Sequence, residues 1–144
     1  MRVDIIHINK TAPTPTYATT GSAGVDLYAA VEMPQFIEPG EVAYVPTGVC
    51  IHMGRSGLVG LLFPRSGLAC NDRICLANGV GVIDSDYQDQ IIVCLENRGE
   101  DTYIVEPDDR IAQIVFLPNF RAVFNIVENF DHLTNRGGFG RSGR

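Results

Sequence analysis

Residues 74–84 read Ile74-Cys75-Leu76-Ala77-Asn78-Gly79-Val80-Gly81-Val82-Ile83-Asp84. Two short apolar runs lie on either side of an Asn-Gly pair, and both turn residues tolerate the positive φ that a tight primed turn needs. The stretch therefore predicts a β-hairpin with strands near Ile74–Leu76 and Val80–Ile83. It is the strongest hairpin signal in the chain, and it indicates an all-β fold.

The same alternation of short apolar runs and turns continues in both directions from this stretch. Gly and Pro occur 15 and 8 times in 144 residues, so turns recur at short intervals. Further strands are expected near Val3–Ile8, Val25–Tyr28, Val42–Val45, Val49–Ile51, Leu58–Phe63, Ile91–Leu95, Tyr103–Val105, Ile111–Phe116 and Ala122–Val127. One short helix is expected after Ser66, ended by Asn71-Asp72. This pattern predicts a β-sandwich or barrel rather than alternating βαβ units.

Length and composition indicate one acidic globular domain. A chain of 144 residues with 45% hydrophobic and 19% charged residues is typical of a folded domain with its own core. The net charge of −6 repels a phosphate backbone at long range, which argues against a nucleic-acid polymer as partner. A few arginines or a metal ion can still bind a small phosphorylated ligand. From Thr134 onward the chain is rich in Gly and Arg, so we expect a β domain over 1–133 and a flexible tail over 134–144.

The chain shows no signal for secretion or membrane insertion. Asp4 interrupts the N-terminus early, and no apolar run approaches the roughly 18 residues of a membrane span. We therefore expect a cytoplasmic protein that does not contact a membrane. The four cysteines form no CxxC pair and lack a neighbouring His to complete a zinc site, so we expect reduced, mostly buried thiols. They are Cys50, Cys70, Cys75 and Cys94.

Two stretches carry residues suited to phosphate chemistry. Arg65-Ser66-Gly67 lies at the expected start of the short helix, where backbone N–H groups, a hydroxyl and a guanidinium would suit a phosphate. The alternative is an ordinary N-cap serine beside an exposed arginine. Asp84 and Asp86 share a face if their strand continues, and one of them could activate water or hold a metal. The alternative there is an acidic turn that ends a strand.

Three further features are candidates for a binding role. Asp26 has apolar neighbours, and a partly buried carboxylate needs a partner, which could be an ion pair or the surroundings of a metal. In 109–114, strand alternation predicts that Asp109 and Gln113 share one face and Arg110 the other. The tail offers a stacking ring and several phosphate donors, or it simply frays. These tail residues are Phe139, Arg136, Arg141 and Ser142.

Five segments taken in order resemble the motifs of the trimeric dUTPases, and the resemblance covers nearly the whole chain. They are 23–30 (AGVDLYAA), 64–69 (PRSGLA), 81–87 (GVIDSDY), 109–113 (DRIAQ) and 137–140 (GGFG). The resemblance implies a distorted jelly-roll β-barrel, a homotrimer with active sites shared between subunits, and Mg²⁺-dependent hydrolysis of dUTP to dUMP and pyrophosphate. It also implies the metabolic role of such enzymes, which limit uracil in DNA and supply dUMP for thymidylate synthesis.

The resemblance also implies roles for single residues. Asp84 would be the general base for the water that attacks the α-phosphorus, and Asp26 would help to hold the metal through water. Phosphate contacts are implied for Arg65, Ser66, Gly67, Gln113, Arg136 and Ser142. Uracil and deoxyribose contacts are implied for Asn78, Val82, Ile83, Asp84, Tyr87, Ile92 and Phe139, with Tyr87 excluding a 2′-hydroxyl.

The sequence departs from the family pattern at three places. Asp89 and Asp108 stand where relatives usually have Gly, so a positive φ there would be more costly. Arg136 lies three residues before Phe139 rather than five, which makes Arg141 a rival for the γ-phosphate. Three other interpretations remain open: a capsid or sugar-binding jelly roll, a nucleotide-binding protein of weak activity that signals to a partner, and a deaminase of similar fold that would release ammonia.

Overall fold

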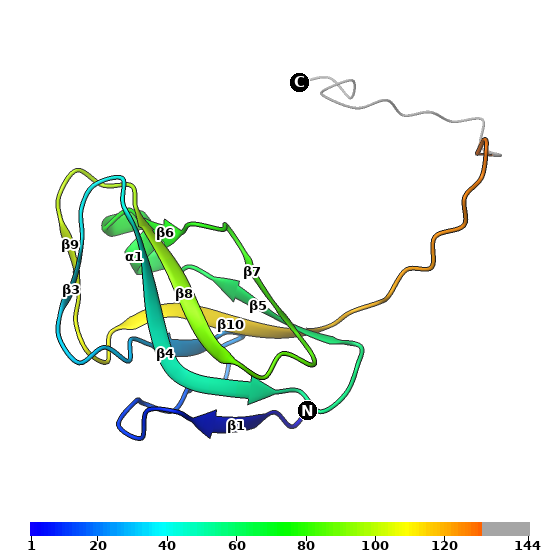
Figure 1. The fold of residues 1–144 in the computed structure, drawn as a ribbon, viewed down its shortest axis with the longest axis horizontal. Coiled ribbons are helices and arrows are strands. Elements are labelled where there is room, and N and C mark those ends of the chain that lie inside the picture. Colours follow the sequence, from blue (N-terminus) through cyan, green and yellow to red (C-terminus); the bar gives the residue numbers. More distant parts are fainter. Residues whose placement is uncertain (131–144) are drawn as a thin grey trace.

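The computed structural model of the chain describes residues 1–130. Its strands are β1 (Asp4–His7), β2 (Val25–Tyr28), β3 (Gln35–Ile37), β4 (Val42–His52), β5 (Leu58–Phe63), β6 (Ile74–Leu76), β7 (Gly81–Asp84), β8 (Gln90–Asn97), β9 (Tyr103–Val105) and β10 (Arg110–Pro118), with one helix, α1 (Ser66–Asn71). Figure 1 shows the strands arranged in two facing layers, with an extended arm leaving the end of β10. No helix within residues 1–130 is long and apolar enough to cross a membrane.

The strands form two four-stranded antiparallel sheets and one two-stranded sheet. The orders are β1-β4-β8-β6, β2-β10-β5-β7 and β3-β9. The fold is a jelly roll, which confirms the predicted class. The core lies between the two large sheets, where alternate strand residues such as Leu62 and Ile91 are buried. Burial of one such side chain contributes about 1.5–3 kcal/mol.

The predicted hairpin is wrong, although its turn is present. Gly79 has φ +71°, and its N–H donates to the Leu76 carbonyl at 3.0 Å, so the Asn-Gly pair does reverse the chain locally. However, β6 pairs with β8 and β7 pairs with β5. The turn therefore passes the chain from β6 in one sheet to β7 in the other.

Other expected elements agree with the structure to different degrees. The ranges expected for β2, β5, β6 and β9 and the short helix are confirmed. The two strands expected around Pro46-Thr47-Gly48 are one continuous strand, β4, with an irregular register between Pro46 and Cys50. Gly48 absorbs that irregularity at φ +68°, and its N–H donates to Gln90 Oε1 at 2.9 Å. The short strand β3 was not predicted.

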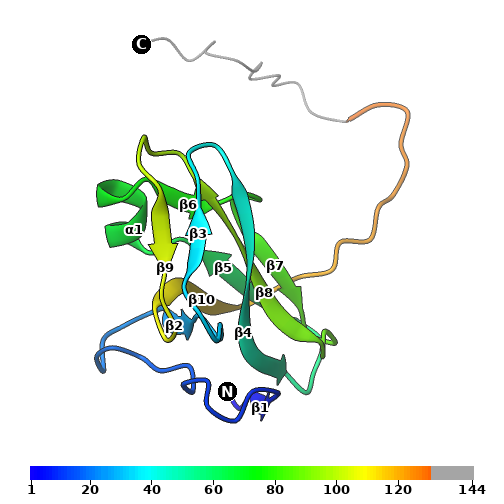
Figure 2. The same ribbon diagram turned by 60° about the vertical axis from the view of Figure 1, so that its left-hand side comes forward.

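The strand expected over Ala122–Val127 is also wrong. Within residues 1–130 this segment has no strand beside it, so its backbone has no ladder to join. Residues 119–130 instead form an arm that leaves the body, as Figures 1 and 2 both show. Most of its large apolar side chains are almost fully exposed, with Phe120 at 98%, Phe124 at 90% and Ile126 at 97%. Among residues 1–130, this arm has no packing partner.

The expectation of mostly buried thiols is wrong as well. Cys70 is exposed and the other three cysteines are partly exposed, all as free thiols. Cys50, Cys75 and Cys94 occupy strand positions that alternate with buried neighbours, and therefore face outward. Apolar sequence surroundings do not distinguish the two faces of a strand.

Candidate functional site

Several of the residues proposed for chemistry line two cavities at different corners of one sheet. One cavity, of about 330 Å³, lies where β2 and β10 meet the start of α1, and is called here the Asp26 cavity. Its lining includes Asp26, Arg65, Ser66, Arg110 and Gln113. The other, of about 510 Å³, lies at the end of β7 and is called here the Asp84 cavity. Its lining includes His52, Arg55, Ser56, Asp84, Asp86 and Arg121.

In the Asp26 cavity the carboxylate is buried and fully engaged. The Asp26 side chain is 12% exposed; Arg65 Nε lies 3.0 Å from its Oδ1 and Arg110 Nη1 lies 3.3 Å from its Oδ2. Two guanidiniums thus supply the partners that a buried carboxylate requires. The ion-pair interpretation of Asp26 is confirmed, and both carboxylate oxygens already accept hydrogen bonds.

The predicted placement of Arg110 is wrong because β10 contains a β-bulge. The register between β10 and β2 shifts between Arg110 and Ala112, and both Ile111 and Ala112 are buried. The extra residue reverses the alternation, so Arg110 faces the same cavity as Gln113 instead of the opposite side. Bulges of this kind leave no clear mark in a single sequence.

Gln113 is held across the mouth of the Asp26 cavity. It pairs with Asp26 in the ladder, and its Nε2 donates to the Pro64 carbonyl at 3.1 Å. The side chain passes directly over Gly24, where an added Cβ would collide with Gln113 Oε1. Gly24 therefore leaves the space that this amide occupies.

The start of α1 differs from the N-cap alternative. The N-cap residue is Arg65, in extended conformation and without a side-chain capping bond, whereas Ser66 is the first helical residue. Ser66 and Gly67 are exposed, and an added Cβ at Gly67 would meet nothing within 4 Å. The Ser66 hydroxyl is therefore not committed to capping and faces open space beside Arg65.

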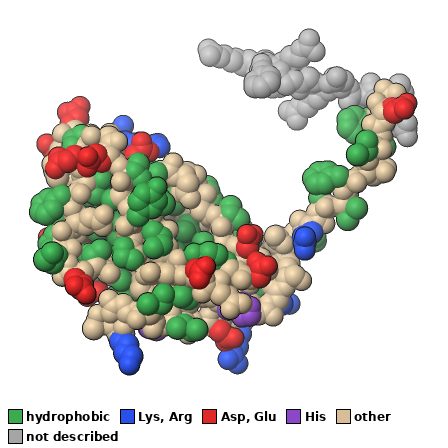
Figure 3. All heavy atoms as spheres, in the orientation of Figure 1, with side chains coloured by type: hydrophobic (Ala, Val, Ile, Leu, Met, Phe, Trp, Pro, Cys, Tyr) green, Lys and Arg blue, Asp and Glu red, His purple; other side chains and the backbone are tan. Residues whose placement is uncertain are grey.

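In the Asp84 cavity the acids are exposed and unpaired. Within residues 1–130, neither Asp84 nor Asp86 takes part in an ion pair. β7 ends at Asp84, and Tyr87 N–H donates to the Asp84 carbonyl at 3.1 Å. Asp86 is thus in a turn, so the strand does not continue past Asp84, and the alternative of an acidic turn that ends a strand describes the backbone here. Figure 3 shows acidic, histidine and arginine side chains gathered where the arm leaves the body.

Tyr87 is held beside this turn by its own hydroxyl. Its O–H donates to the Gln90 carbonyl at 2.8 Å. Burial, followed by the nearby charge of Asp89, raises the pKa of Tyr87, so the hydroxyl remains a donor in the physiological range.

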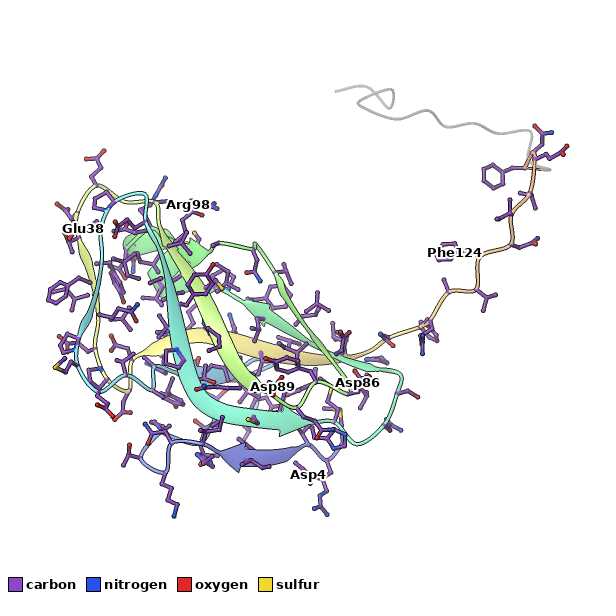
Figure 4. All side chains as sticks on the ribbon, viewed as in Figure 1. Asp4, Glu38, Asp86, Asp89, Arg98 and Phe124 are labelled. Atoms are coloured by element: carbon purple, nitrogen blue, oxygen red, sulfur yellow. The ribbon has the colours of Figure 1, made fainter. Side chains whose placement is uncertain are left out.

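Asp89 has no positive φ, whereas Asp108 does, at 66°. Figure 4 places Asp86 and Asp89 at the end of the molecule opposite Glu38 and Arg98.

The other residues expected to contact the base and sugar lie outside the Asp84 cavity lining. Asn78 and Val82 are exposed, Ile83 is partly buried, and Ile92 on β8 is 42% exposed. The tail residues Arg136, Phe139, Arg141 and Ser142, and the expected division between 1–133 and 134–144, lie outside the described residues.

Several cavity residues were not predicted as site residues. Arg110 lies within a quoted motif but received no site role, while His52, Arg55 and Arg121 were not considered. One signal was available in the sequence: Arg55-Ser56-Gly57-Leu58 repeats the tetrapeptide Arg65-Ser66-Gly67-Leu68. The arginine and the serine of each copy line one of the two cavities.

Comparisons with known proteins all point to one family. The family model described as dUTPase matches residues 10–143. A deoxyuridine 5'-triphosphate nucleotidohydrolase of Sodalis glossinidius is 50% identical over 133 residues, covering 92% of this chain and 88% of that protein. The corresponding protein of Escherichia coli is 49% identical over 139 residues, covering 95% and 91%. Among solved structures, a Staphylococcus bacteriophage 80alpha dUTPase with dUPNHPP is similar at a TM-score of 0.89 and 26% identity, covering 99% of this chain and 98% of that one.

Proposed function

Because the chain belongs to the dUTPase family and is thus a hydrolase of dUTP, we propose that it acts at sites shared between three copies, with Asp84 as general base. The observation that carries the shared site is the distance between the two cavities within one chain. Asp26 lies on β2 and Asp84 on β7, which are the opposite edges of the sheet β2-β10-β5-β7. Three strand spacings separate them by about 14 Å across the sheet.

The strand registers add a displacement along the strands. Asp26 is level with Gln113 of β10, whereas Asp84 is level with Val59 of β5 and hence with Leu117 of β10. Four residues of β10 add about 13 Å, so the two carboxylates are about 20 Å apart. A base acts within hydrogen-bond reach or through one water, about 6 Å in all. One triphosphate held at Asp26 therefore cannot be attacked from Asp84 of the same chain.

The surface between the two cavities supports assembly. The outer face of this sheet carries apolar side chains between Asp26 and Asp84, and Val82 and Leu117 are 62% and 41% exposed. The arm adds further exposed apolar side chains, among them Phe120 and Phe124. Apolar surface of this extent favours contact with another copy. The family resemblance gives the number of copies as three.

Each residue then has a chemical role in the composite site. Asp84 of one chain, free of ion pairs within residues 1–130, accepts the proton of the attacking water. Arg65, Ser66, Gly67 and Gln113 of another chain bind the phosphates, together with Arg136 and Ser142 of the tail. Phe139 of the tail stacks on the uracil. Positioning and charge neutralisation supply most of the catalysis in such reactions.

Mg²⁺ is the proposed cofactor. Among the described residues, no group of three or more His, Cys, Asp or Glu could hold a metal, so this part of the chain offers no cage of protein ligands. Such a donor set fits Mg²⁺, which commonly keeps its waters and takes most other ligands from substrate phosphates. Asp26, with both oxygens engaged, would contact it through water. The bound ion would reduce the negative charge on the phosphates.

The substrate is selected by shape. Asn78 and the backbone of Val82–Asp84 read the uracil edge, Ile92 contacts the nucleoside, and Tyr87 excludes a 2′-hydroxyl. The hydroxyl of Tyr87 is tied to Gln90, which fixes the ring against the turn. Steric exclusion needs no base-specific side chain. Acting in the cytoplasm, such an enzyme would limit uracil in DNA and supply dUMP for thymidylate synthesis.

A mixed assembly tests the shared site. Chains carrying Asp84→Asn and chains carrying Arg65→Ala, each nearly inactive alone, are combined in equal amounts into mixed trimers. When the chains associate at random, each site draws its Asp84 and its Arg65 independently from two different chains, so about a quarter of all sites are complete. We expect recovery of about a quarter of the wild-type activity, with dUMP and pyrophosphate as products. Verified mixed trimers without recovery would contradict the shared site, whereas release of ammonia would contradict the reaction.

A further inference from the structure

Three strands end together at the Asp84 cavity and bring two arginines to it. Pro118 of β10 pairs with Leu58 of β5, and Val59 of β5 pairs with Asp84 of β7. The turn before β5 presents Arg55, and the segment after β10 presents Arg121. Asn119 N–H donates to the Gly57 carbonyl at 3.0 Å, which ties these two segments together. The arginines therefore come from separate elements that are fixed to each other.

These arginines are not used to hold the fold. Within residues 1–130, Arg2, Arg65, Arg98 and Arg110 form ion pairs with acids, whereas Arg55, Arg73 and Arg121 form none. Of these three, Arg55 and Arg121 line the Asp84 cavity and Arg73 does not. Both are exposed and line the same cavity as Asp84 and Asp86. No guanidinium there lies within ion-pair distance of a carboxylate, so opposite charges share the cavity without neutralising each other.

We propose that Arg55 and Arg121 bind phosphate oxygens of the nucleoside triphosphate whose α-phosphorus is attacked from Asp84. The inference rests on the proposed function and adds two residues to its phosphate-binding set. A triphosphate that approaches Asp84 and Asp86 without compensation is repelled by two like charges. Two guanidiniums in the same cavity remove that repulsion, and they supply donors that match phosphate oxygens.

The geometry of the turn suits this role. Gly54 and Gly57 have φ of 69° and 81°, so the turn projects Arg55 and Ser56 at its tip. Nothing in this turn requires an arginine, because its exposed side chain makes no hydrogen bond within residues 1–130. The composite site then has guanidiniums on both sides of the phosphates: Arg65 from one chain, and Arg55 and Arg121 from the chain that supplies Asp84.

Steady-state kinetics on the full-length assembly test the proposal. Arg55→Gln and Arg121→Gln should each raise KM for dUTP by about tenfold, the loss of one charge-assisted contact, with kcat within about twofold. Inhibition by pyrophosphate should weaken in parallel, whereas binding of deoxyuridine should not change. Arg55→Lys should restore part of the affinity. Arg98→Gln serves as the control. It removes the same charge just after the end of β8, at a position that lines neither cavity, and should leave KM unchanged.

The outcomes separate this inference from the proposed function. Unchanged KM and pyrophosphate inhibition in Arg55→Gln, with activity still dependent on Asp84, would overturn the inference alone. A KM that rises equally in Arg98→Gln would also overturn it, because the effect would then follow net charge. Insensitivity of turnover to Asp84→Asn would instead overturn the proposed function. Size-exclusion chromatography shows whether Arg121→Gln disturbs assembly of the trimer. If it does, KM and pyrophosphate inhibition of Arg55→Gln alone decide whether the inference holds.

Discussion

The Asp26 cavity and the Asp84 cavity contain the same kinds of residue in opposite electrostatic states. Each has a carboxylate on an edge strand, a copy of Arg-Ser-Gly-Leu and a further arginine. Asp26 is buried and paired with two guanidiniums, whereas Asp84 is exposed and has no ion pair within residues 1–130. A carboxylate engaged on both oxygens fixes its surroundings, while an unpaired one retains lone pairs for water. The difference supports the proposal that Asp84, and not Asp26, acts as the base.

The two copies of Arg-Ser-Gly-Leu show how little the tetrapeptide itself determines. At 65–68 it begins α1, and at 55–58 it forms a turn in which Gly57 has φ +81°. The flanking strands decide the outcome, because β5 must begin at Leu58 to pair with β10. The shared composition still has a consequence, since both copies present a guanidinium and a hydroxyl to a cavity.

The largest expected effect is that of Asp84→Asn. The substitution removes the proton acceptor and keeps the shape, so kcat for dUTP should fall by about 10²–10⁴. Because the carboxylate is exposed and unpaired, the melting temperature should not change. Single-turnover kinetics and thermal unfolding measure the two effects. If Asp84→Asn lowered the melting temperature as well as kcat, Asp84 would have a structural role like that of Asp26. That outcome would contradict the contrast between the two cavities.

Asp26→Asn should show the complementary pattern. It leaves two guanidiniums facing a neutral amide, at a cost of about 1–3 kcal/mol after allowance for the partial exposure of both arginines. In a chain of 144 residues this corresponds to a melting temperature lower by roughly 3–10 °C. KM for dUTP should rise as Arg65 loses its orientation. Chemical denaturation of Asp26→Asn and Asp84→Asn side by side compares their free energies of unfolding. Equal values would refute the contrast between the two carboxylates.

Gly24→Ala should disturb the Asp26 cavity without touching a charge. A Cβ at this position would occupy the space of Gln113 Oε1, so the amide must leave the mouth of the cavity. We expect KM for dUTP to rise about tenfold, with little change in kcat. Gly21→Ala, three residues earlier in the chain, where a Cβ also meets nothing within 4 Å, is the matched control, because Gly21 has no role in the proposed site. Similar KM values in both variants would show that the position of Gln113 is unimportant.

Local patterns in the sequence predicted most strands and the helix, and the family resemblance pointed to the acids of both cavities. The pairing of strands could not be predicted from local patterns. An Asn-Gly turn has the same sequence whether its two flanking strands pair with each other or belong to different sheets. The face of β10 on which Arg110 lies was predicted wrongly, because one extra residue in the strand reverses the alternation of its side chains. The distance between Asp26 and Asp84 depends on the sheet order, which no local pattern contains. Arg55 was missed although the repeated tetrapeptide marked it.

The smallest expected effects concern the turns beside the two cavities. Asp108, next to the strand that carries Arg110, has φ 66°, which an aspartate adopts at a cost that glycine avoids. Asp108→Gly should raise the free energy of unfolding by only a few tenths of a kcal/mol, because glycine also loses more chain entropy on folding. The backbone bond from its N–H to the Ala29 carbonyl, 2.9 Å long, does not depend on the side chain, so kcat should not change.

Gly57→Ala, at the Asp84 cavity, should act in the opposite direction. Its φ is +81°, and the nearest atom to an added Cβ is the Asn119 carbonyl oxygen at 3.8 Å, so there is space and only the backbone is strained. We expect a loss of about 1 kcal/mol. Urea denaturation of Asp108→Gly and Gly57→Ala in parallel measures the expected rise and the expected fall in the free energy of unfolding. If Asp108→Gly lowered stability, the positive φ at 108 would not be a source of strain, and the aspartate side chain would have to stabilise that turn.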